Sequence, residues 1–374
     1  MRCRADLYGP PAGHKGPPYI WLHKGPRHIF PISSLVTNTT RRRAPTPAGE
    51  RFRRRLSIIS HALYLDVNRD YRRTLLLTGS GRSGTTWAAE VANFDHHYRV
   101  MVEPFHRGNV PAVRAFARRQ YLRAESNDPT YLGPATAIFT GALRDAWVDG
   151  LNLPGVYTQR IVKDVRTTLM LGWMRAHFPG MPIVLLLRHP CAVARSRAQL
   201  GWDDIREDYL TQPDLIADHL GPFVAAIRAA RSDFERHVFD WCVENYVPFR
   251  SFARGDIHLA FYENLCVDPA AEVSRLFAFL GRRYDNRVFE NMTTPSASVQ
   301  VTAVDRSRPR PSLDGARLVE SWRNNVAPSD VERAYAIVES FGLEKIYGRS
   351  SMPDIAGAEA TFSGRAAGAV RGPS

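Results

Sequence analysis

Short apolar runs alternate with longer amphipathic stretches along most of the chain. Five of the runs are uninterrupted and typical of strands, and they occupy residues 74–78, 99–103, 160–163, 182–187 and 257–261. Strands without polar interruption are expected where both faces of a sheet are covered, as in a parallel sheet between helices. The pattern therefore predicts one α/β domain, over residues 70–348, with a central and mainly parallel sheet of about five strands.

Stretches with helical spacing separate these runs. They are predicted at residues 85–94, 110–124, 166–178, 190–199, 222–246, 269–280 and 328–341. Asp268 before Pro269 and Ser329 before Asp330 are typical of helix starts, because a side-chain oxygen there can accept a hydrogen bond from a free amide. Proline also suits the first helical turn, where its missing N–H costs nothing.

The two ends of the chain differ from this body. Residues 1–60 are rich in Pro, Gly and Arg and show no sustained periodicity, which predicts a flexible extension or a start site placed too far upstream. They carry twelve Lys and Arg against two acidic residues, which is +10 of the net charge of +13. The body is therefore nearly neutral, and the basic character belongs to the N-terminal arm. Residues 349–374 are predicted to be a flexible tail.

Composition narrows the class of protein. With 44% hydrophobic and 10% aromatic residues, the chain is neither wholly disordered nor fibrous. No run approaches the roughly 18 apolar residues of a membrane-spanning helix, and the N-terminus lacks a compact apolar export segment. Four cysteines lie far apart, without the spacing of zinc or redox pairs: Cys3, Cys191, Cys242 and Cys266. We expect a cytoplasmic protein with reduced thiols, no transmembrane segment and no metal.

A glycine-rich turn follows the first predicted strand and precedes a helical pattern, over residues 79–87. Such a turn can cradle a phosphate, because its backbone amides and the helix dipole face the anion. An ATP-binding loop would carry lysine after its second glycine. Here Thr85 takes that place and the cation is Arg82, which suits a single 5′-phosphate near Thr85 and Thr86 better than a magnesium-bound triphosphate.

The string at 82–87 resembles the 5′-phosphosulfate loop of sulfotransferases that use 3′-phosphoadenylyl sulfate (PAPS). It joins the arginine of carbohydrate and tyrosylprotein members to the Thr-Thr-Trp of cytosolic members. The resemblance implies a three-layer fold like that of P-loop NTPases. It also implies that the donor is bound by Arg82, Ser83, Gly84, Thr85 and Thr86, with Trp87 against the adenine. A core aromatic on the first helix is the other interpretation of Trp87.

A second match lies about a hundred residues later, at 185–196, and resembles the 3′-phosphate site of the same family. Arg188 ends a predicted strand and offers paired donors to a phosphate, and Ser196 adds a hydroxyl from the next helix. A surface ion pair is the other interpretation of Arg188. The string at 261–265 resembles the late signature of the family, which implies that Tyr262 faces the adenine and the 3′-phosphate.

Two further matches concern the chemistry. Glu103 follows Arg82 by 21 residues, as the catalytic carboxylate does in the tyrosylprotein branch, and Lys163 lies in a segment that resembles the one contacting the sulfuryl group. The resemblance implies that Glu103 is the general base, while Arg82 and Lys163 neutralise charge on the sulfuryl and leaving oxygens. His106 is the other candidate base, since cytosolic members use histidine, but their histidine follows the lysine-bearing strand by two residues, where this chain has Val165. Without the family resemblance, Glu103 would be interpreted as a carboxylate at a strand end and Lys163 as a lysine in a salt bridge.

We therefore expect sulfuryl transfer from PAPS to a hydroxyl or amine of a carbohydrate, glycolipid or other small molecule. Residues 104–160 interleave aromatic and basic side chains, which fits either an acceptor site or a packed segment with one solvated basic face. Residues 202–218 are a candidate cover, and Arg308 and Arg310 lie in a loop that would close over the 3′-phosphate. The sequence leaves a homodimer open and indicates no specific nucleic-acid partner.

Two other function classes remain. A P-loop kinase of a small metabolite would need a lysine after Gly84, which is absent, and a metal-holding carboxylate, for which Asp164 is the candidate. A catalytically silent nucleotide-binding or nucleic-acid-binding protein would use the basic arm as its partner surface. Its affinity would fall steeply with salt and disappear on removal of residues 1–55.

Overall fold

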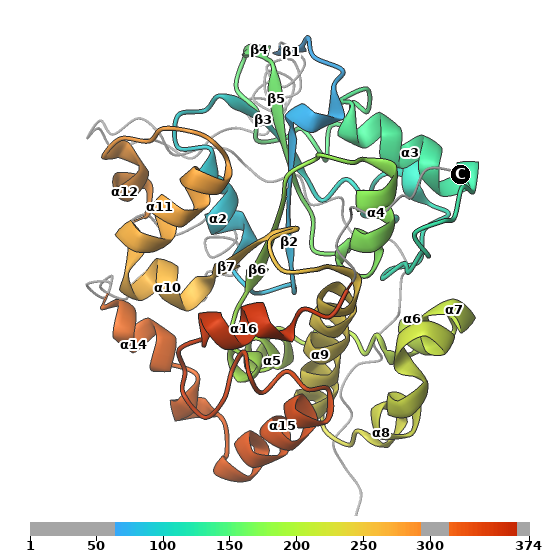
Figure 1. Cartoon of the computed structure of the whole chain (residues 1–374), viewed down its shortest axis with the longest axis vertical. Coiled ribbons are helices and arrows are strands. Elements are labelled where there is room, and N and C mark those ends of the chain that lie inside the picture. Colours follow the sequence, from blue (N-terminus) through green and yellow to red (C-terminus); the bar gives the residue numbers. More distant parts are fainter. Residues whose placement is uncertain (1–63, 293–313, 365–374) are drawn as a thin grey trace, which may run out of the picture. The chain divides into compact units, whose positions relative to one another are not determined.

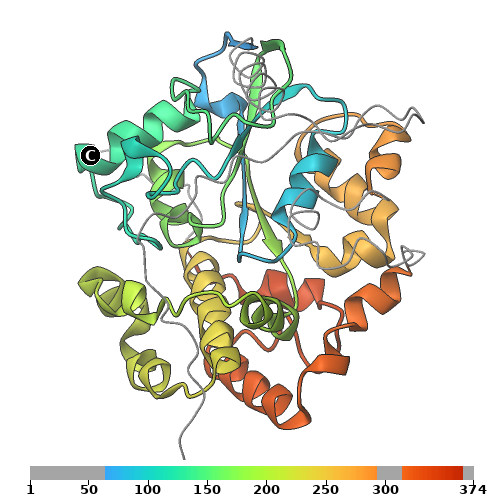
Figure 2. The same ribbon diagram turned by 180° about the vertical axis from the view of Figure 1, so that it is seen from behind.

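The computed structural model of the chain describes residues 64–292 and 314–364 (Figures 1 and 2). The N-terminal extension expected at residues 1–60 lies outside the described residues, as does the loop that carries Arg308 and Arg310. The chain between these gaps forms the sheet and the helices around it.

Five parallel strands form the central sheet: β2 (Thr74–Gly79), β3 (Tyr98–Val102), β5 (Gln159–Lys163), β6 (Ile183–Leu187) and β7 (His258–Phe261). Their order is β3-β5-β2-β6-β7, and every neighbouring pair is parallel. The predicted α/β class and the five predicted strands are confirmed. Because β2 lies in the middle, the loop that follows it emerges between the ends of β5 and β6.

Helices cover both faces of the sheet, because successive strand side chains point to opposite sides. Leu75 and Leu77 of β2 belong to one buried cluster, which includes side chains of α2 (Thr85–Ala92), α11 (Pro269–Phe279) and α12 (Arg287–Met292). Leu76 belongs to a larger cluster on the other face, with side chains of α4 (Leu171–His177), α5 (Pro190–Gln199) and α9 (Asp233–Ser251).

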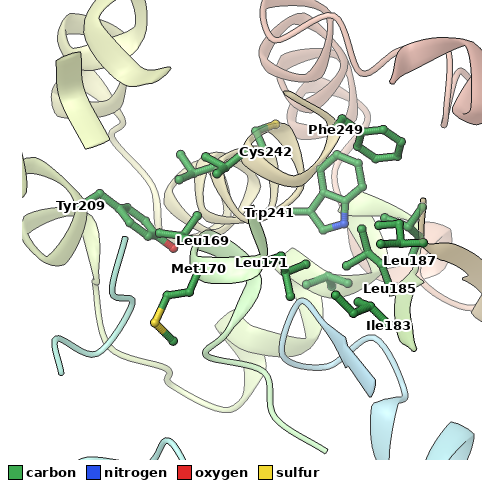
Figure 3. Packing of buried hydrophobic residues seen from close by; sticks show 14 of the residues in the cluster. Leu169, Met170, Leu171, Ile183, Leu185, Leu187, Tyr209, Trp241, Cys242 and Phe249 are labelled. Atoms are coloured by element: carbon green, nitrogen blue, oxygen red, sulfur yellow. The ribbon is translucent and has the colours of Figure 1, made fainter. Parts of the chain in front are cut away.

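The larger cluster centres on α9. Figure 3 shows Trp241 of this helix beside Leu185 and Leu187 of β6, and all three side chains are at most 1% exposed. Each such side chain contributes about 1.5–3 kcal/mol by leaving water. This packing fixes α9 close to the carboxyl end of β6, where Arg188 lies.

Further elements complete the described chain. A two-stranded parallel sheet joins β1 (Tyr64–Asp66) to β4 (Gly155–Tyr157). The remaining helices are α3 (Pro129–Phe139), α6 (Arg206–Leu210), α7 (Pro213–Leu215), α8 (Val224–Ala229), α10 (Tyr262–Val267), α14 (Gly315–Glu320), α15 (Pro328–Ser340) and α16 (Ile355–Thr361). Within the described ranges, none of the helices has the length and apolar character that crossing a bilayer requires.

The helix predicted at 110–124 is wrong. The structure has only a short 3₁₀ turn there, Pro111–Val113, followed by irregular chain. The backbone finds its partners elsewhere, because Gln212 accepts a hydrogen bond from the amide of Tyr121 at 2.8 Å and donates one to the carbonyl of Arg119 at 2.7 Å. Arg119 is buried on Glu244 at 2.9 Å, and this long-range ion pair favours the extended path over a local helix.

Three other expectations concern helix ends, and one of them is confirmed. The helix predicted at 222–246 is divided into α8 and α9, and Ser232 begins α9 with a reciprocal cap to Glu235. Asp268 is confirmed as a cap, since it accepts a hydrogen bond from the amide of Ala271. The start predicted at Ser329 is wrong, because α15 begins at Pro328 without a side-chain cap.

The start of the segment expected to be a flexible tail is folded. Asp354 caps α16, Ala358 is fully buried, and Phe362 lies against Phe249 of α9 with ring centroids 4.7 Å apart. Small residues look like low-complexity sequence but also allow a helix to pack closely, and here they do so. The flexible-tail prediction is therefore wrong for residues 355–361, while residues 365–374 lie outside the described chain.

Candidate active site

The glycine-rich turn joins β2 to the first turn of α2. Gly84 has φ +95°, and a Cβ there would lie 2.7 Å from the Tyr262 ring, so both the backbone and the space require glycine. Gly84 provides no side-chain cap for α2. The Ser83 hydroxyl is buried and, within the described residues, has no hydrogen-bond partner. The turn therefore presents donors that a phosphate group would satisfy.

Arg188 follows β6 and lies beside this turn. Its guanidinium donates a hydrogen bond to the backbone carbonyl of Arg82 at 3.0 Å and lies 4.0 Å from the centroid of the Tyr262 ring. The Tyr262 ring meets the Trp87 ring edge to face at 5.7 Å. The structure thus brings together four residues that the sequence assigned to the donor site, from β6, α10, α2 and the turn.

Arg82 points toward the predicted 3′-phosphate residues. Its Nε donates to the Ser196 hydroxyl at 3.1 Å. Arg82 has φ +77°, and this left-handed backbone sets the direction of its side chain. The resemblance implies that Arg82 and Lys163 both act on the sulfuryl group, but among the described residues no hydrogen bond joins these two side chains. In this conformation Arg82 belongs with Arg188 and Ser196.

The cluster is strongly cationic. Burial lowers the pKa of Arg82, and the nearby charges of Arg188 and Arg197 lower it further. Within the part of the chain that the structure describes, no carboxylate forms an ion pair with Arg82, Arg188 or Arg195. The Nε atoms of Arg188 and Arg195 are buried and have no hydrogen-bond partner among the described residues. Uncompensated guanidinium groups favour an anionic ligand.

Glu103 forms a second centre, at the end of β3. Its backbone has φ +49°, and its amide donates to the Lys163 carbonyl at 2.7 Å, which continues the β3–β5 pairing. One carboxylate oxygen accepts a hydrogen bond from Lys163 at 2.9 Å, and the other accepts one from Arg166 at 2.6 Å. The structure therefore brings together two of the three predicted catalytic residues, Glu103 and Lys163.

Charge dominates the protonation of Glu103. Burial disfavours the ionised carboxylate, but the attraction of Lys163 and then of Arg166 outweighs it and holds the pKa of Glu103 well below its usual range. The group is therefore a carboxylate throughout the neutral range.

His106 lies near this centre. The His106 amide donates to the Glu103 carbonyl at 3.0 Å, and its ring meets that of Trp147 edge to face at 5.9 Å. Burial and the charge of Arg166 lower the pKa of His106, so the ring is neutral at neutral pH. Its Nδ1 is buried and has no hydrogen-bond partner within the described chain. His106 stays a second candidate base.

A family model described as the sulfotransferase family matches residues 75–286, which is more than half of the chain. The chain belongs to the sulfotransferase family. The matched region runs from β2 to the residue before α12, and it contains both anion-binding segments and Glu103. The family resemblance inferred from the motifs is confirmed.

No curated protein matches this sulfotransferase. Solved structures do. The sulfotransferase domain of the Synechococcus PCC 7002 olefin synthase is 14% identical, with 72% of this chain and 94% of that chain covered and a TM-score of 0.41. Sulfotransferase STF1 from Mycobacterium tuberculosis is 13% identical, with coverages of 67% and 79% and a TM-score of 0.35. Mouse sulfotransferase SULT7A1, complexed with PAP, is 14% identical, with coverages of 76% and 87% and a TM-score of 0.32.

Side chains of helix α9 hold both anion-binding segments of this sulfotransferase through hydrogen bonds. Asn245 donates to the Ser80 hydroxyl at 3.1 Å, and the Trp241 indole donates to the Arg188 carbonyl at 2.9 Å. Arg197 donates to the Gly81 carbonyl at 3.1 Å and is itself held by Glu244 at 2.6 Å. These supporting residues were missed in the sequence. Their signal is a pair of polar residues, 244 and 245, inside an otherwise apolar stretch.

Arg166 was also missed. It follows Lys163 by three residues, after Asp164, whose carboxylate accepts hydrogen bonds from the amides of Phe105 at 2.7 Å and Arg166 at 2.8 Å. Asp164 is fully buried, and burial raises its pKa. Its two oxygens are used to join the segments after β3 and β5. Among the described residues, no group of three or more His, Cys, Asp or Glu side chains is arranged to hold a metal ion.

The aromatic and basic segment 104–160 is largely packed. Phe105, Phe116 and Phe139 are buried in the larger core cluster, and Arg123 forms an ion pair with Asp218 at 2.7 Å. These contacts agree with the interpretation of residues 104–160 as a packed segment with one solvated basic face. Trp202, in the predicted cover, differs: its indole lies over Gly81, where a Cβ would be 2.6 Å from the ring, and it is 37% exposed.

Proposed function

We propose that the protein transfers the sulfuryl group of PAPS to a hydroxyl or amine of a small-molecule or glycan acceptor. One observation carries the proposal: the two candidate anion-binding segments, which are 106 residues apart in the chain, are joined at the carboxyl ends of β2 and β6 by the hydrogen bond from Arg188 to the carbonyl of Arg82. PAPS carries an anionic group at each end of its ribose, and this spacing of two cationic segments suits such a ligand better than a nucleotide with one phosphate chain.

The residues present fit the donor. The buried, unpartnered Ser83 hydroxyl and the uncapped start of α2 would bind the 5′-phosphosulfate, together with Thr85 and Thr86. Arg188 and Ser196 would bind the 3′-phosphate, with Arg82 beside them. Trp87 and Tyr262 form an aromatic pair next to Arg188 that would contact the adenine.

The donor, when bound, supplies a sulfuryl group that can pass in line to an acceptor oxygen or nitrogen. Glu103 would take the proton of the acceptor, a role that typically contributes about 10²–10⁴-fold in rate. Lys163 would neutralise the charge that develops on the transferring and leaving oxygens, which typically contributes about 10²-fold or more. Glu103 and Lys163 lie at the adjacent ends of β3 and β5, within hydrogen-bond distance of each other.

The kinase alternative lacks support from the site geometry. Asp164, its candidate metal ligand, uses both oxygens to accept backbone hydrogen bonds. The silent binding protein of the second alternative would not need the Glu103 and Lys163 arrangement. A carbohydrate or glycolipid acceptor, a homodimer and a cytoplasmic location remain predictions from the sequence.

Radiolabelled PAPS turnover against a panel of glycans, lipids, phenols and peptides tests the proposal. Glu103→Gln and Arg188→Ala are the diagnostic variants. We expect label transfer by the wild-type protein, loss of transfer at normal donor affinity in the first variant, and loss of donor affinity in the second. Transfer that is unaffected by both substitutions would refute the site.

A further inference from the structure

Glu103 has a separate cation on each carboxylate oxygen. Lys163 Nζ lies 2.9 Å from Oε1, and Arg166 Nη1 lies 2.6 Å from Oε2. The three side chains are only 8–21% exposed. Lys163 alone would neutralise Glu103, and the buried Asp164 carboxylate lies 4.0 Å from the Arg166 guanidinium. Glu103 nevertheless has two cationic partners where one would balance its charge, and the second of them is Arg166.

The two cations are held differently. The backbone of Arg166 is fixed by Asp164, which accepts its amide at 2.8 Å and also accepts the amide of Phe105, two residues after Glu103. Asp164 thereby ties the segment of Arg166 to the segment of Glu103. Arg166 has a planar, rigid guanidinium, whereas Lys163 has a compact charge on a flexible stem. Lys163 is thus better able to change partner while Arg166 stays on Glu103.

We propose that Arg166 is a positioning residue, which keeps Glu103 ionised and aimed while Lys163 leaves Oε1 to contact the anionic donor. The inference rests on the proposed sulfuryl transfer. Oε1 is then free to take the proton from the acceptor O–H or N–H. The acceptor atom forms the new bond to sulfur, and the bond from sulfur to the bridging oxygen breaks. The electron pair leaves with adenosine 3′,5′-bisphosphate.

The movement of Lys163 away from Oε1 also changes the basicity of Glu103. With both cations in contact, the pKa of Glu103 lies well below its usual range, so the free enzyme holds a weak base. Departure of Lys163 removes one of these attractions and strengthens the base when the donor is bound. The other charged or titratable groups that act on Glu103 or Arg166 are Asp164, after β5, and His106. After Lys163 has left Oε1, Arg166 is the cation that keeps Glu103 ionised.

The variants Arg166→Gln and Arg166→Lys test the proposal, with the exposed Arg114→Gln as matched control. The first readout needs no donor: carbon-13 NMR of the Glu103 carboxyl in each full-length protein. We expect Arg166→Gln to move the Glu103 titration upward by at least about one pH unit. Arg166→Lys should restore part of the shift, and Arg114→Gln should leave it unchanged. Thermal unfolding checks that each variant folds.

The second readout is the pH–rate profile of transfer. In Arg166→Gln, the acid limb should move to higher pH and kcat should fall by roughly 10–100-fold because Glu103 is no longer aimed. KM for PAPS and the affinity for adenosine 3′,5′-bisphosphate should stay within about twofold. An unmoved Glu103 titration would overturn the inference, and a selective loss of bisphosphate affinity would make Arg166 a donor ligand instead. Absence of transfer in the wild-type protein would count against the proposed function, while the NMR titration would still decide the placement of Arg166.

Discussion

Arg188 donates from its guanidinium Nη1 to the backbone carbonyl oxygen of Arg82, across 3.0 Å. The two residues come from different segments, the end of β6 and the turn after β2, and these strands are hydrogen-bonded neighbours in the sheet. The bond leaves the Nε of Arg188 without a partner among the described residues. We therefore expect Arg188 both to hold the turn in place and to donate a hydrogen bond to the 3′-phosphate.

Arg188→Ala should weaken binding of adenosine 3′,5′-bisphosphate by roughly 10–150-fold, the range expected for a lost hydrogen bond to a charged group. Binding of adenosine 5′-phosphate, which lacks the 3′-phosphate, should weaken by less than about tenfold. Calorimetry with the two ligands measures both effects, and the exposed Arg228→Ala on α8 is the matched control. Equal losses for the two nucleotides would mean that Arg188 acts only through the turn.

Glu103→Gln should lower kcat for sulfuryl transfer by about 10²–10⁴-fold, because an amide cannot accept the acceptor proton. The affinity for adenosine 3′,5′-bisphosphate should change little, since Glu103 contacts Lys163 and Arg166 rather than the anion-binding turn. Initial rates at saturating PAPS provide the measurement, with the exposed Glu207→Gln on α6 as control. Unchanged kcat would transfer the role of base to another group, with His106 the first to examine.

Gly81→Ala should weaken donor binding, because the new methyl group would lie 2.6 Å from the ring of Trp202. The obstacle is one side chain, and Gly81 is not among the described residues with positive φ. The double variant Gly81→Ala, Trp202→Ala should therefore bind adenosine 3′,5′-bisphosphate better than Gly81→Ala alone. Fluorescence or calorimetric titration of the four proteins of this cycle gives the coupling. Strictly additive losses would show that Trp202 does not press on the turn.

His189 should make the fold sensitive to acid. Burial, with smaller contributions from Arg323 and Arg188, lowers the pKa of His189 to about 3. The unfolded chain therefore takes up this proton first, near pH 6.5, and the free energy of unfolding falls by about 1.4 kcal/mol per pH unit below that value, down to about pH 3. The contribution is fully present above pH 6.5.

His189→Asn isolates this contribution. Asparagine can still accept the amide hydrogen bond of Cys191 at the start of α5, but it does not titrate and loses the stacking on Trp322 at 4.5 Å. The variant should be less stable than wild type at pH 8, and the gap should narrow by about 1–2 kcal/mol between pH 6.5 and 5. Denaturant unfolding at several pH values provides the test. A constant gap would show that His189 does not titrate on unfolding in this range.

Most of the fold could be predicted from local sequence patterns. The runs at 74–78 and 182–187 predict buried strands by themselves, and Gly84 with Thr85 marks the turn into α2, because strand, turn and helix start are all local. Segment 110–124 could not be predicted in this way. Its conformation depends on Gln212 and Glu244, which lie far along the chain and satisfy its polar groups.

The site shows the same division. Arg188 and Ser196 were found because they belong to one local motif, a strand end and the following helix, that resembles the 3′-phosphate site of the family. The contact between Arg166 and Glu103 depends on β5 lying next to β3, and the same apolar runs fit several strand orders. The buried Arg197 was hidden for a similar reason, since its partners Gly81 and Glu244 belong to separate elements.

Two calorimetric titrations of the full chain, one with adenosine 3′,5′-bisphosphate and one with ATP and magnesium, decide whether the two anion-binding segments form a PAPS site. We expect saturable binding of the bisphosphate without added metal, weakened strongly by Arg188→Ala, and much weaker binding of ATP with magnesium. Binding of ATP with magnesium but not of the bisphosphate would rule out a PAPS site.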